Sequence, residues 1–278
     1  MHQFTGNLVG LWLRGVTRWV TRKRCRFALV TPPFLSRQVL LAKDGQSPLQ
    51  LFARDRHDMN MYNYMFLDEP YSFRKMKREA CITKAFDDIV RDKARPFIVD
   101  CGANIGSATV YFGQTYPQAT VVAIEPEAGN FAVLERNCAQ LGNVRPILAG
   151  VSNQSGMADT IDTGLGHDAF RTRVSDTGTT PLVSMNDLLR EAETRGEKPF
   201  IVKIDIEGFE AQLFSSDTEW VDKFPVVIIE FHDWMLPRQK TSQNALRVLA
   251  GLDRDFILKG ENIFSISNRL RNPQSADS

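Results

Sequence analysis

A dense group of ionisable side chains lies in the segment KIDIEGFE, where Lys203, Asp205 and Glu207 alternate with isoleucines. Residues two apart on a β-strand point to the same side, so these three share one side for as long as the strand lasts. Removing such groups from water costs stability unless they pair with one another or with a ligand, so the spacing indicates a reactive site. A structural ion pair, with Glu210 at a helix N-terminus, is the alternative.

These residues suit a reaction that removes a proton from a weak nucleophile, such as a sugar hydroxyl. Asp205 and Glu207 are the candidate bases, and Lys203 could orient a carboxylate or a substrate oxygen. His232 directly follows the next apolar run, VVIIEF, and is a further candidate, although an ordinary partly buried histidine explains it equally well. Asp205, Glu207 and His232 could also bind Mg²⁺ together with a diol, but spacing alone does not establish that geometry, and we assign no metal ligand.

Two further acids end apolar runs, because Asp100 ends FIVD and Glu125 ends TVVAIE. Between them lies GANIG, whose Gly102 and Gly106 allow a tight turn and a close approach of a ligand to bare backbone. An acid at this distance after a glycine turn commonly accepts hydrogen bonds from both hydroxyls of a ribose. The pattern predicts an adenosine-type ligand with Glu125 at its ribose, although packing alone can also require two glycines.

Two ligands of this type compete, a nicotinamide dinucleotide and S-adenosylmethionine. A dinucleotide turn carries a middle glycine that lets the pyrophosphate approach, but Asn104 occupies that position here. Asp100, two residues before Gly102, would repel a phosphate and attract the ammonium and sulfonium groups of S-adenosylmethionine. The charge argument therefore favours the methyl donor.

The elements that must position these acids can be read from the hydrophobic pattern. From Phe97 onward, short β-rich runs alternate with helical spacers, interrupted by an irregular polar stretch over residues 152–181. The last two runs, FILK and IFSIS, flank Gly260 like a hairpin. The alternation predicts a doubly wound α/β domain, with a mostly parallel sheet, helices on both faces and one antiparallel edge strand.

Several of these segments together resemble the FkbM-type S-adenosylmethionine-dependent methyltransferases. The similar segments, within about residues 97–267, are DCGANIG, IEPEAGNFAVLERN, AGVSNQSG, SMNDLL, KIDIEGFE and GENIFSIS. The resemblance implies the class I methyltransferase fold, with a seven-stranded sheet whose last strand is antiparallel. It also implies that Glu125 holds the ribose and that Ser152 or Asn153 lies near the adenine. The residues that it places around the methionine part are Asp100, Gly102, Asn104 and Gly106.

The N-terminus differs in charge from the rest of the chain. The 278 residues include 34 basic and 33 acidic ones, a balance typical of an ordinary globular protein, yet no acid precedes Asp44. Leu8, Trp12 and Val16 would share one face of a helix with arginines to one side, a pattern typical of a membrane surface or an acidic partner. We therefore expect peripheral membrane contact through residues 1–26, with docking on the chain's own domain as the alternative.

We expect three parts along the chain: an accessory region over residues 1–70, the α/β domain over 71–270 and a disordered polar tail over 271–278. The four cysteines form no CxxC pair and no signal peptide is apparent, which predicts free thiols and a cytoplasmic location, at most peripheral to the inner face of the membrane.

The predicted function is methylation of a hydroxyl on a sugar, polysaccharide precursor or other secondary metabolite, as the resemblance implies. A nicotinamide-dependent oxidoreductase and a non-catalytic binding protein on the same sheet are the alternatives. The excess of basic over acidic residues is confined to the N-terminal end of the chain, and basic and aromatic residues do not alternate around the site. We therefore expect no nucleic-acid partner. No motif identifies the acceptor or the oligomeric state.

Overall fold

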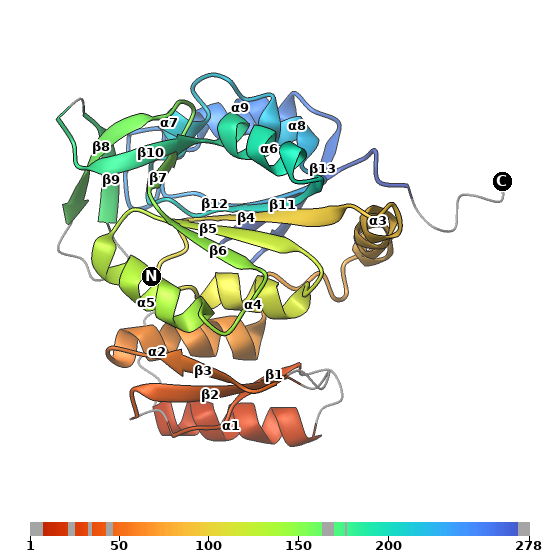
Figure 1. Cartoon of the computed structure of the whole chain (residues 1–278), viewed down its shortest axis with the longest axis vertical. Coiled ribbons are helices and arrows are strands. Elements are labelled where there is room, and N and C mark those ends of the chain that lie inside the picture. Colours follow the sequence, from red (N-terminus) through yellow and green to blue (C-terminus); the bar gives the residue numbers. More distant parts are fainter. Residues whose placement is uncertain are drawn as a thin grey trace.

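The computed structural model describes residues 8–21, 26–32, 35–42, 47–162, 170–175 and 177–271, so the predicted disordered tail lies, from residue 272 onward, outside the described residues. A seven-stranded sheet occupies the centre of the molecule, with helices on both faces (Figure 1). Its strands, in spatial order, are β13 (Arg254–Lys259), β14 (Asn262–Ser267), β12 (Val226–Glu230), β11 (Glu197–Ile204), β4 (Arg95–Cys101), β5 (Thr120–Glu125) and β6 (Val144–Leu148).

The central strands are nearly continuous apolar runs because both of their faces are covered. On β4, Ile98 packs into the core formed with α4 (Ser107–Thr115) and α5 (Ala128–Cys138). Phe97 and Val99 pack into the opposite core, with α6 (Met185–Thr194) and α8 (Trp220–Lys223). The period of two along the strand thus decides which helical layer each side chain contacts.

All neighbouring strands of this sheet run parallel except β14, which is antiparallel to both β12 and β13. It lies one position in from the edge, and its turn from β13 uses Gly260 with a φ of +64°. This arrangement confirms the doubly wound, mostly parallel, seven-stranded sheet. Chain order reverses between β4 and β11, and such a switch point is where ligands bind in open α/β sheets.

The remaining helices of this domain connect the strands. They are α3 (Glu79–Arg91) before β4, α7 (Glu210–Leu213) after β11 and α9 (Gln243–Ala250) before β13. Cys101, on β4, is fully buried and unpaired, as expected for a packed thiol rather than a nucleophile.

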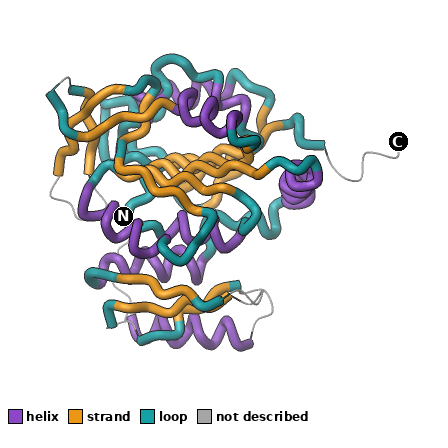
Figure 2. The backbone as a smooth tube through the Cα atoms, viewed as in Figure 1, coloured by secondary structure: helices purple, strands orange, loops and turns teal. Residues whose placement is uncertain are grey.

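An accessory layer covers the outer side of α4 and α5, as Figures 1 and 2 show. It contains α1 (Leu8–Thr21), an antiparallel sheet of β1 (Phe27–Leu29), β2 (Arg37–Ala42) and β3 (Leu49–Phe52), then α2 (Arg56–Asn63) and the π-helical turn η1 (Tyr64–Asp68). None of the helices in the described part of the chain combines the length and the apolar character needed to cross a membrane.

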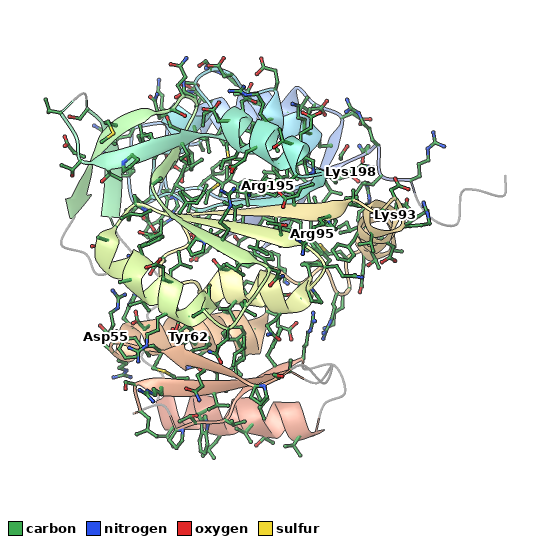
Figure 3. All side chains as sticks on the ribbon, viewed as in Figure 1. Asp55, Tyr62, Lys93, Arg95, Arg195 and Lys198 are labelled. Carbon is green, nitrogen blue, oxygen red and sulfur yellow. The ribbon has the colours of Figure 1, made fainter. Side chains whose placement is uncertain are left out.

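Asn137, a fully buried residue of α5, ties this layer to the main domain. Its amide nitrogen donates to the Tyr62 hydroxyl on α2 and to the Ile105 carbonyl, each at 2.7 Å. Its amide oxygen accepts from the Phe52 backbone N–H at 2.7 Å. Figure 3 shows Tyr62 where α2 meets the main domain, so the accessory layer is bonded directly to the loop that follows β4.

The stretch predicted to be irregular, residues 152–181, instead contributes most of a third sheet. Its strands, in spatial order, are β7 (Gly150–Ser152), β10 (Thr180–Ser184), β8 (Gly156–Asp162) and β9 (Phe170–Val174). The register sets Asp159 opposite Arg173, and polar residues fill much of β8 and β9. A strand with few apolar residues gives no clear alternation, so the hydrophobic pattern missed it.

Candidate active site

A pocket opens at the carboxyl ends of β4, β5, β11 and β12, at the switch point of the central sheet. Arg95 and Lys198 belong to the opposite, amino ends of β4 and β11 (Figure 3). The predicted residues that line the pocket are Gly102, Asn104, Glu125, Lys203, Asp205 and Glu207. Strand ends that are far apart in the sequence therefore meet at one site, as the pattern of acids predicted.

Glu125 is nearly buried at the end of β5, with 4% of its surface exposed. Its Oε2 accepts from the Asn104 backbone N–H at 2.8 Å, and its Oε1 accepts from the Glu127 N–H at 3.0 Å. Burial raises the pKa of Glu125 to about 7, although both hydrogen bonds favour the ionised form. Each carboxylate oxygen has a second lone pair, so Glu125 can still accept two hydroxyls from a ligand.

The two glycines of the turn after β4 serve close packing. Gly102 has a φ of +75°, and a Cβ there would lie 1.8 Å from the Asp205 carbonyl oxygen. Gly106 has a φ of +85°, and a Cβ there would lie 2.7 Å from Cδ1 of Leu134 on α5. Gly102 lines the pocket but Gly106 does not, so the structure places Gly106 between α4 and α5 rather than at a ligand.

Asp100 and Lys203 form a buried ion pair beside the pocket, with Nζ 3.2 Å from Oδ1. The other Asp100 oxygen accepts from the Thr109 hydroxyl at 2.6 Å, and Nζ also donates to the Gly102 carbonyl at 2.7 Å. Burial opposes the charge on Lys203, but Asp100 and Asp205 hold its pKa well above the ordinary value. Asp100 is fully buried, contacts Lys203 and is not among the residues that line the pocket, and its place beside the methionine part of a ligand stays a prediction.

Ser152 and Asn153 lie next to the pocket lining rather than in it. The Ser152 hydroxyl donates to the Asn153 side-chain oxygen at 3.0 Å, and the Asn153 nitrogen donates to the Ser216 hydroxyl at 2.9 Å. The residues of this segment that line the pocket are Gly150 and Val151. The buried side chains of Ser152 and Asn153 have hydrogen-bonding partners next to the pocket lining, and their place near an adenine stays a prediction.

Asp205, Glu207 and His232 converge at one side of the site. His232 Nε2 lies 3.4 Å from Asp205 Oδ1 and 3.8 Å from Glu207 Oε1. His232 Nδ1 lies 2.8 Å from Oε1 of Glu210, which is fully buried. A carboxylate oxygen accepts hydrogen bonds, so the Nδ1–H group of His232 donates a hydrogen bond to Glu210. The other ring nitrogen, Nε2, faces Asp205 and Glu207.

The backbone, rather than the strand pleat, brings Glu207 to this group. Strand β11 ends at Ile204, so the expected alternation covers Lys203 but not Glu207. Glu207 and Gly208 have φ values of +56° and +95°, and this left-handed turn directs the chain from the strand into α7. A positive φ at a residue other than glycine is uncommon and is found often at functional sites.

The charges in this group shift one another's titration. Burial opposes the ionisation of Asp205, but Lys203 and His232 hold its pKa well below the usual range. Burial would lower the pKa of His232, but Asp205 and Glu210 outweigh it and raise the pKa to about 11. At neutral pH the imidazole is therefore protonated and Asp205 is a weak base, which leaves Glu207 as the other carboxylate that the sequence analysis proposed as a base.

Two kinds of pocket residue were missed by the sequence analysis. Glu230 ends β12 and lines the pocket, and burial together with Asp205 raises its pKa to about 8. The signal was available, since an acid ends VVIIE as Glu125 ends TVVAIE. Tyr64 and Tyr71 line another wall. No motif marks them, because they lie before the segments on which the family resemblance depends.

The strand order, the single antiparallel strand β14 and an acid-lined pocket at the switch point together define a class I methyltransferase fold. Residues 100–258, more than half of the chain, match the methyltransferase FkbM domain family, and the chain belongs to this family.

Named relatives agree with that assignment. The chain is 26% identical over 216 residues to methyltransferase sdnD of Sordaria araneosa, covering 65% of this chain and 81% of that protein. It is 29% identical over 145 residues to the hexuronic acid methyltransferase AglP of Haloferax volcanii, covering 51% of this chain and 58% of that protein. The family and these relatives identify the chain as a methyltransferase.

Solved structures with distant similarity include two further enzymes of this kind. An rRNA methylase from Streptococcus thermophilus has a TM-score of 0.37 at 10% identity, with 65% of this chain and 93% of that chain covered. A precorrin-6y C5,15-methyltransferase from Geobacter metallireducens has a TM-score of 0.34 at 11% identity, with 70% of this chain and 90% of that chain covered.

Proposed function

We propose that this protein uses S-adenosylmethionine to methylate a hydroxyl on a sugar, polysaccharide precursor or other secondary metabolite. The observation that carries the proposal is Glu125, a nearly buried acid at the end of β5 that lines the pocket. Its position suits the two hydroxyls of a ribose, and the backbone N–H of Asn104 donates a hydrogen bond that holds the carboxylate in place. Membership of a methyltransferase family supports this ligand over a nicotinamide dinucleotide.

The charge of the pocket supports a cationic donor. Four acids line the described pocket against one lysine, namely Glu125, Asp205, Glu207 and Glu230 against Lys203. Such a wall attracts the sulfonium and ammonium groups of S-adenosylmethionine and repels the pyrophosphate of a dinucleotide. Burial raises the pKa of Glu125 to about 7 and that of Glu230 to about 8, so the negative charge of this wall increases as the pH rises through that range.

The donor supplies an activated methyl group, and the chain's residues supply alignment and a proton acceptor. An acceptor oxygen forms a bond to the methyl carbon while the carbon–sulfur bond breaks, and its electron pair stays on the sulfur of a neutral thioether. The hydroxyl proton passes to Glu207, because Lys203 and His232 hold the pKa of Asp205 too low for efficient proton removal. Asp205 would then position the acceptor and hold His232.

The proposed acceptor class draws support from one relative and from the pocket walls. AglP, by its name, acts on hexuronic acid, and it aligns with about half of this chain. Tyr64 lines the pocket and is only half-buried, and an aromatic ring is a surface against which sugar rings and other cyclic metabolites pack. Free hexuronic acids and their glycosides are therefore the first acceptors to test.

Calorimetric titration with S-adenosylmethionine and, separately, with NAD tests the donor. We expect saturable binding of S-adenosylmethionine alone, and at least tenfold weaker binding in Glu125→Ala. Preferential binding of NAD would favour the oxidoreductase instead. A methyl-transfer screen over sugar-containing metabolites then separates an enzyme from a non-catalytic binding protein. In that screen Glu207→Gln should retain donor affinity but turn over at least tenfold more slowly.

We also propose that α1 contacts a membrane surface. The face predicted for this contact is partly buried, since Trp12 and Val16 are half-buried and Gly15 beside them packs against Leu67. Val9, Leu13 and Val20 are exposed on another face of α1. The chain between Arg14 and Arg26 is rich in basic residues, which favours an anionic surface. Part of the expected contact, residues 1–7 and 22–25, lies outside the described residues.

A further inference from the structure

We infer that Asp205, Glu207 and His232 form a binding site for a divalent first-row transition-metal ion, which would hold two neighbouring oxygens of the acceptor. The inference rests on the proposed function for the identity of the acceptor, but the ion site itself depends only on the geometry of the three side chains. One ligand atom from each, within the described residues, lies within 4.8 Å of the others.

The separations suit a shared ion better than direct hydrogen bonds. Charge-assisted hydrogen bonds are about 2.7–2.9 Å long, whereas Nε2 of His232 lies 3.4 Å from Asp205 and 3.8 Å from Glu207. An ion about 2.1 Å from each of two ligands holds them about 3.0 Å apart at a right angle and about 4.2 Å apart when they are opposite. Both observed separations fall inside that range.

Glu210 supplies the outer support that ligating histidines usually have. Its fully buried carboxylate oxygen Oε1 lies 2.8 Å from Nδ1 of His232 and accepts a hydrogen bond from it. This hydrogen bond fixes the orientation of the ring and directs Nε2 toward Asp205 and Glu207. A carboxylate–histidine pair of this kind orients the imidazole and raises its basicity as a ligand. His232 itself is 2% exposed, so the ring cannot easily turn away.

Negative groups converge on the imidazole. The carboxylates of Asp205, Glu207 and Glu210 all face His232. Lys203 lies 3.4 Å from Oδ2 of Asp205 and also pairs with Asp100. A divalent ion at this position would replace the Nε2 proton of His232 and bind between that nitrogen and the carboxylates of Asp205 and Glu207.

The ligand set also selects the class of ion. Two carboxylates and one imidazole leave several coordination positions open for acceptor oxygens. Mg²⁺ prefers oxygen ligands and usually binds through carboxylates and water, whereas first-row transition-metal ions bind an imidazole together with carboxylates. A diol of a sugar could fill two open positions, and coordination to a cation would lower the pKa of the hydroxyl that is methylated.

Binding of Mn²⁺ to the metal-stripped full chain, followed by the electron paramagnetic resonance signal of free Mn²⁺, tests the site. We expect one ion per chain, with at least tenfold weaker binding in Glu207→Gln and His232→Ala. Glu210→Gln, which keeps all three ligands, should weaken binding at least threefold. His57→Ala on α2, a histidine away from the pocket, is the matched control and should bind normally.

Absence of a saturable Mn²⁺ site, or unchanged binding in both Glu207→Gln and His232→Ala, would overturn the inference. Displacement of Mn²⁺ by an equal concentration of Mg²⁺ would overturn the assignment of the ion class. Calorimetry of the same variants with 5′-methylthioadenosine, which carries the ribose and adenine of the proposed donor, should give unchanged affinity. That readout shows that a variant is folded, and it separates failure of the ion site from failure of the proposed donor site.

Discussion

Glu125 makes donor binding dependent on pH. Burial raises its pKa to about 7, so the carboxylate is mostly protonated below that pH and ionised above it. Ribose hydroxyls bind the ionised form better, so affinity for 5′-methylthioadenosine should rise about tenfold between about pH 6 and pH 8. This neutral probe lacks the titratable amine of the full donor, so the protein's own groups set the profile.

Calorimetry across that range checks the expectation, with Glu125→Gln as the control that should lose the pH dependence near pH 7 and keep only that of Glu230, whose pKa is about 8. A wild-type profile identical to the variant's would mean that Glu125 does not bind the ribose. The folding stability of the ligand-free protein depends on pH in the opposite direction to donor affinity. A raised pKa in the folded state means that stability from Glu125 is present at low pH and is lost as the pH rises through about 7.

Gly102 is required by the meeting of two backbones. A Cβ at this position would lie 1.8 Å from the Asp205 carbonyl oxygen, and the φ of +75° is itself unfavourable for a side chain. Gly102→Ala should therefore lower the free energy of unfolding by more than about 2 kcal/mol, measured by urea denaturation. Gly142→Ala, where nothing lies within 4 Å, should change it by less than about 0.5 kcal/mol.

At the scale of elements, residue patterns predicted the central sheet because its strands are buried on both faces and its helices are amphipathic. The same argument placed Asp100, Glu125 and Asp205 at neighbouring strand ends, and the structure brings Glu125 and Asp205 to one pocket. The argument did not predict the positions of side chains beyond the regular part of a strand. The direction of Asp100 and the left-handed turn at Glu207 depend on contacts between segments far apart in the sequence.

The third sheet and the turn η1 escaped prediction for a different reason. Strands β8 and β9 are rich in polar residues and give no strong hydrophobic period, and no sequence pattern predicts the π-helical turn η1. The contribution of Tyr64 to the pocket follows from the packing of η1, which the chain's order alone does not reveal.

The proposed membrane contact belongs to α1. Leu13→Glu combined with Val20→Glu would place charges on its exposed apolar face, where these side chains are 52% and 70% exposed. We expect the wild type to sediment with vesicles that contain phosphatidylserine and the double variant to remain in the supernatant, with equal donor affinity. Leu246→Glu, an exposed leucine on α9, is the matched control. Wild-type protein that stays in the supernatant with these vesicles contradicts the proposal.

At the scale of the whole molecule, the accessory layer and the main domain share a core. Phe27 of β1 packs against Tyr111 of α4, with ring centroids 5.6 Å apart, and Arg26 donates to the Gln114 carbonyl at 2.9 Å. The parts before and after the predicted boundary at residue 70 are therefore packed against each other, and the boundary itself stays a prediction.

Asn137→Ala tests this connection. It would leave the Phe52 N–H and the Ile105 carbonyl without their buried partner, at a cost of about 2–4 kcal/mol in the free energy of unfolding, measured by urea denaturation. Gln140→Ala is the control, because Gln140 bonds to Gln50 of the same strand β3 but in an exposed position. A loss no larger than that of the control would mean that the two layers are held mainly by apolar contacts.

The amide of Asn137 has a consequence for regulation. It fastens the accessory layer to Ile105, one residue beyond the Asn104 N–H that binds Glu125. If the proposed membrane contact changes donor affinity through this connection, thermodynamic reciprocity requires the donor to change affinity for the membrane by the same factor.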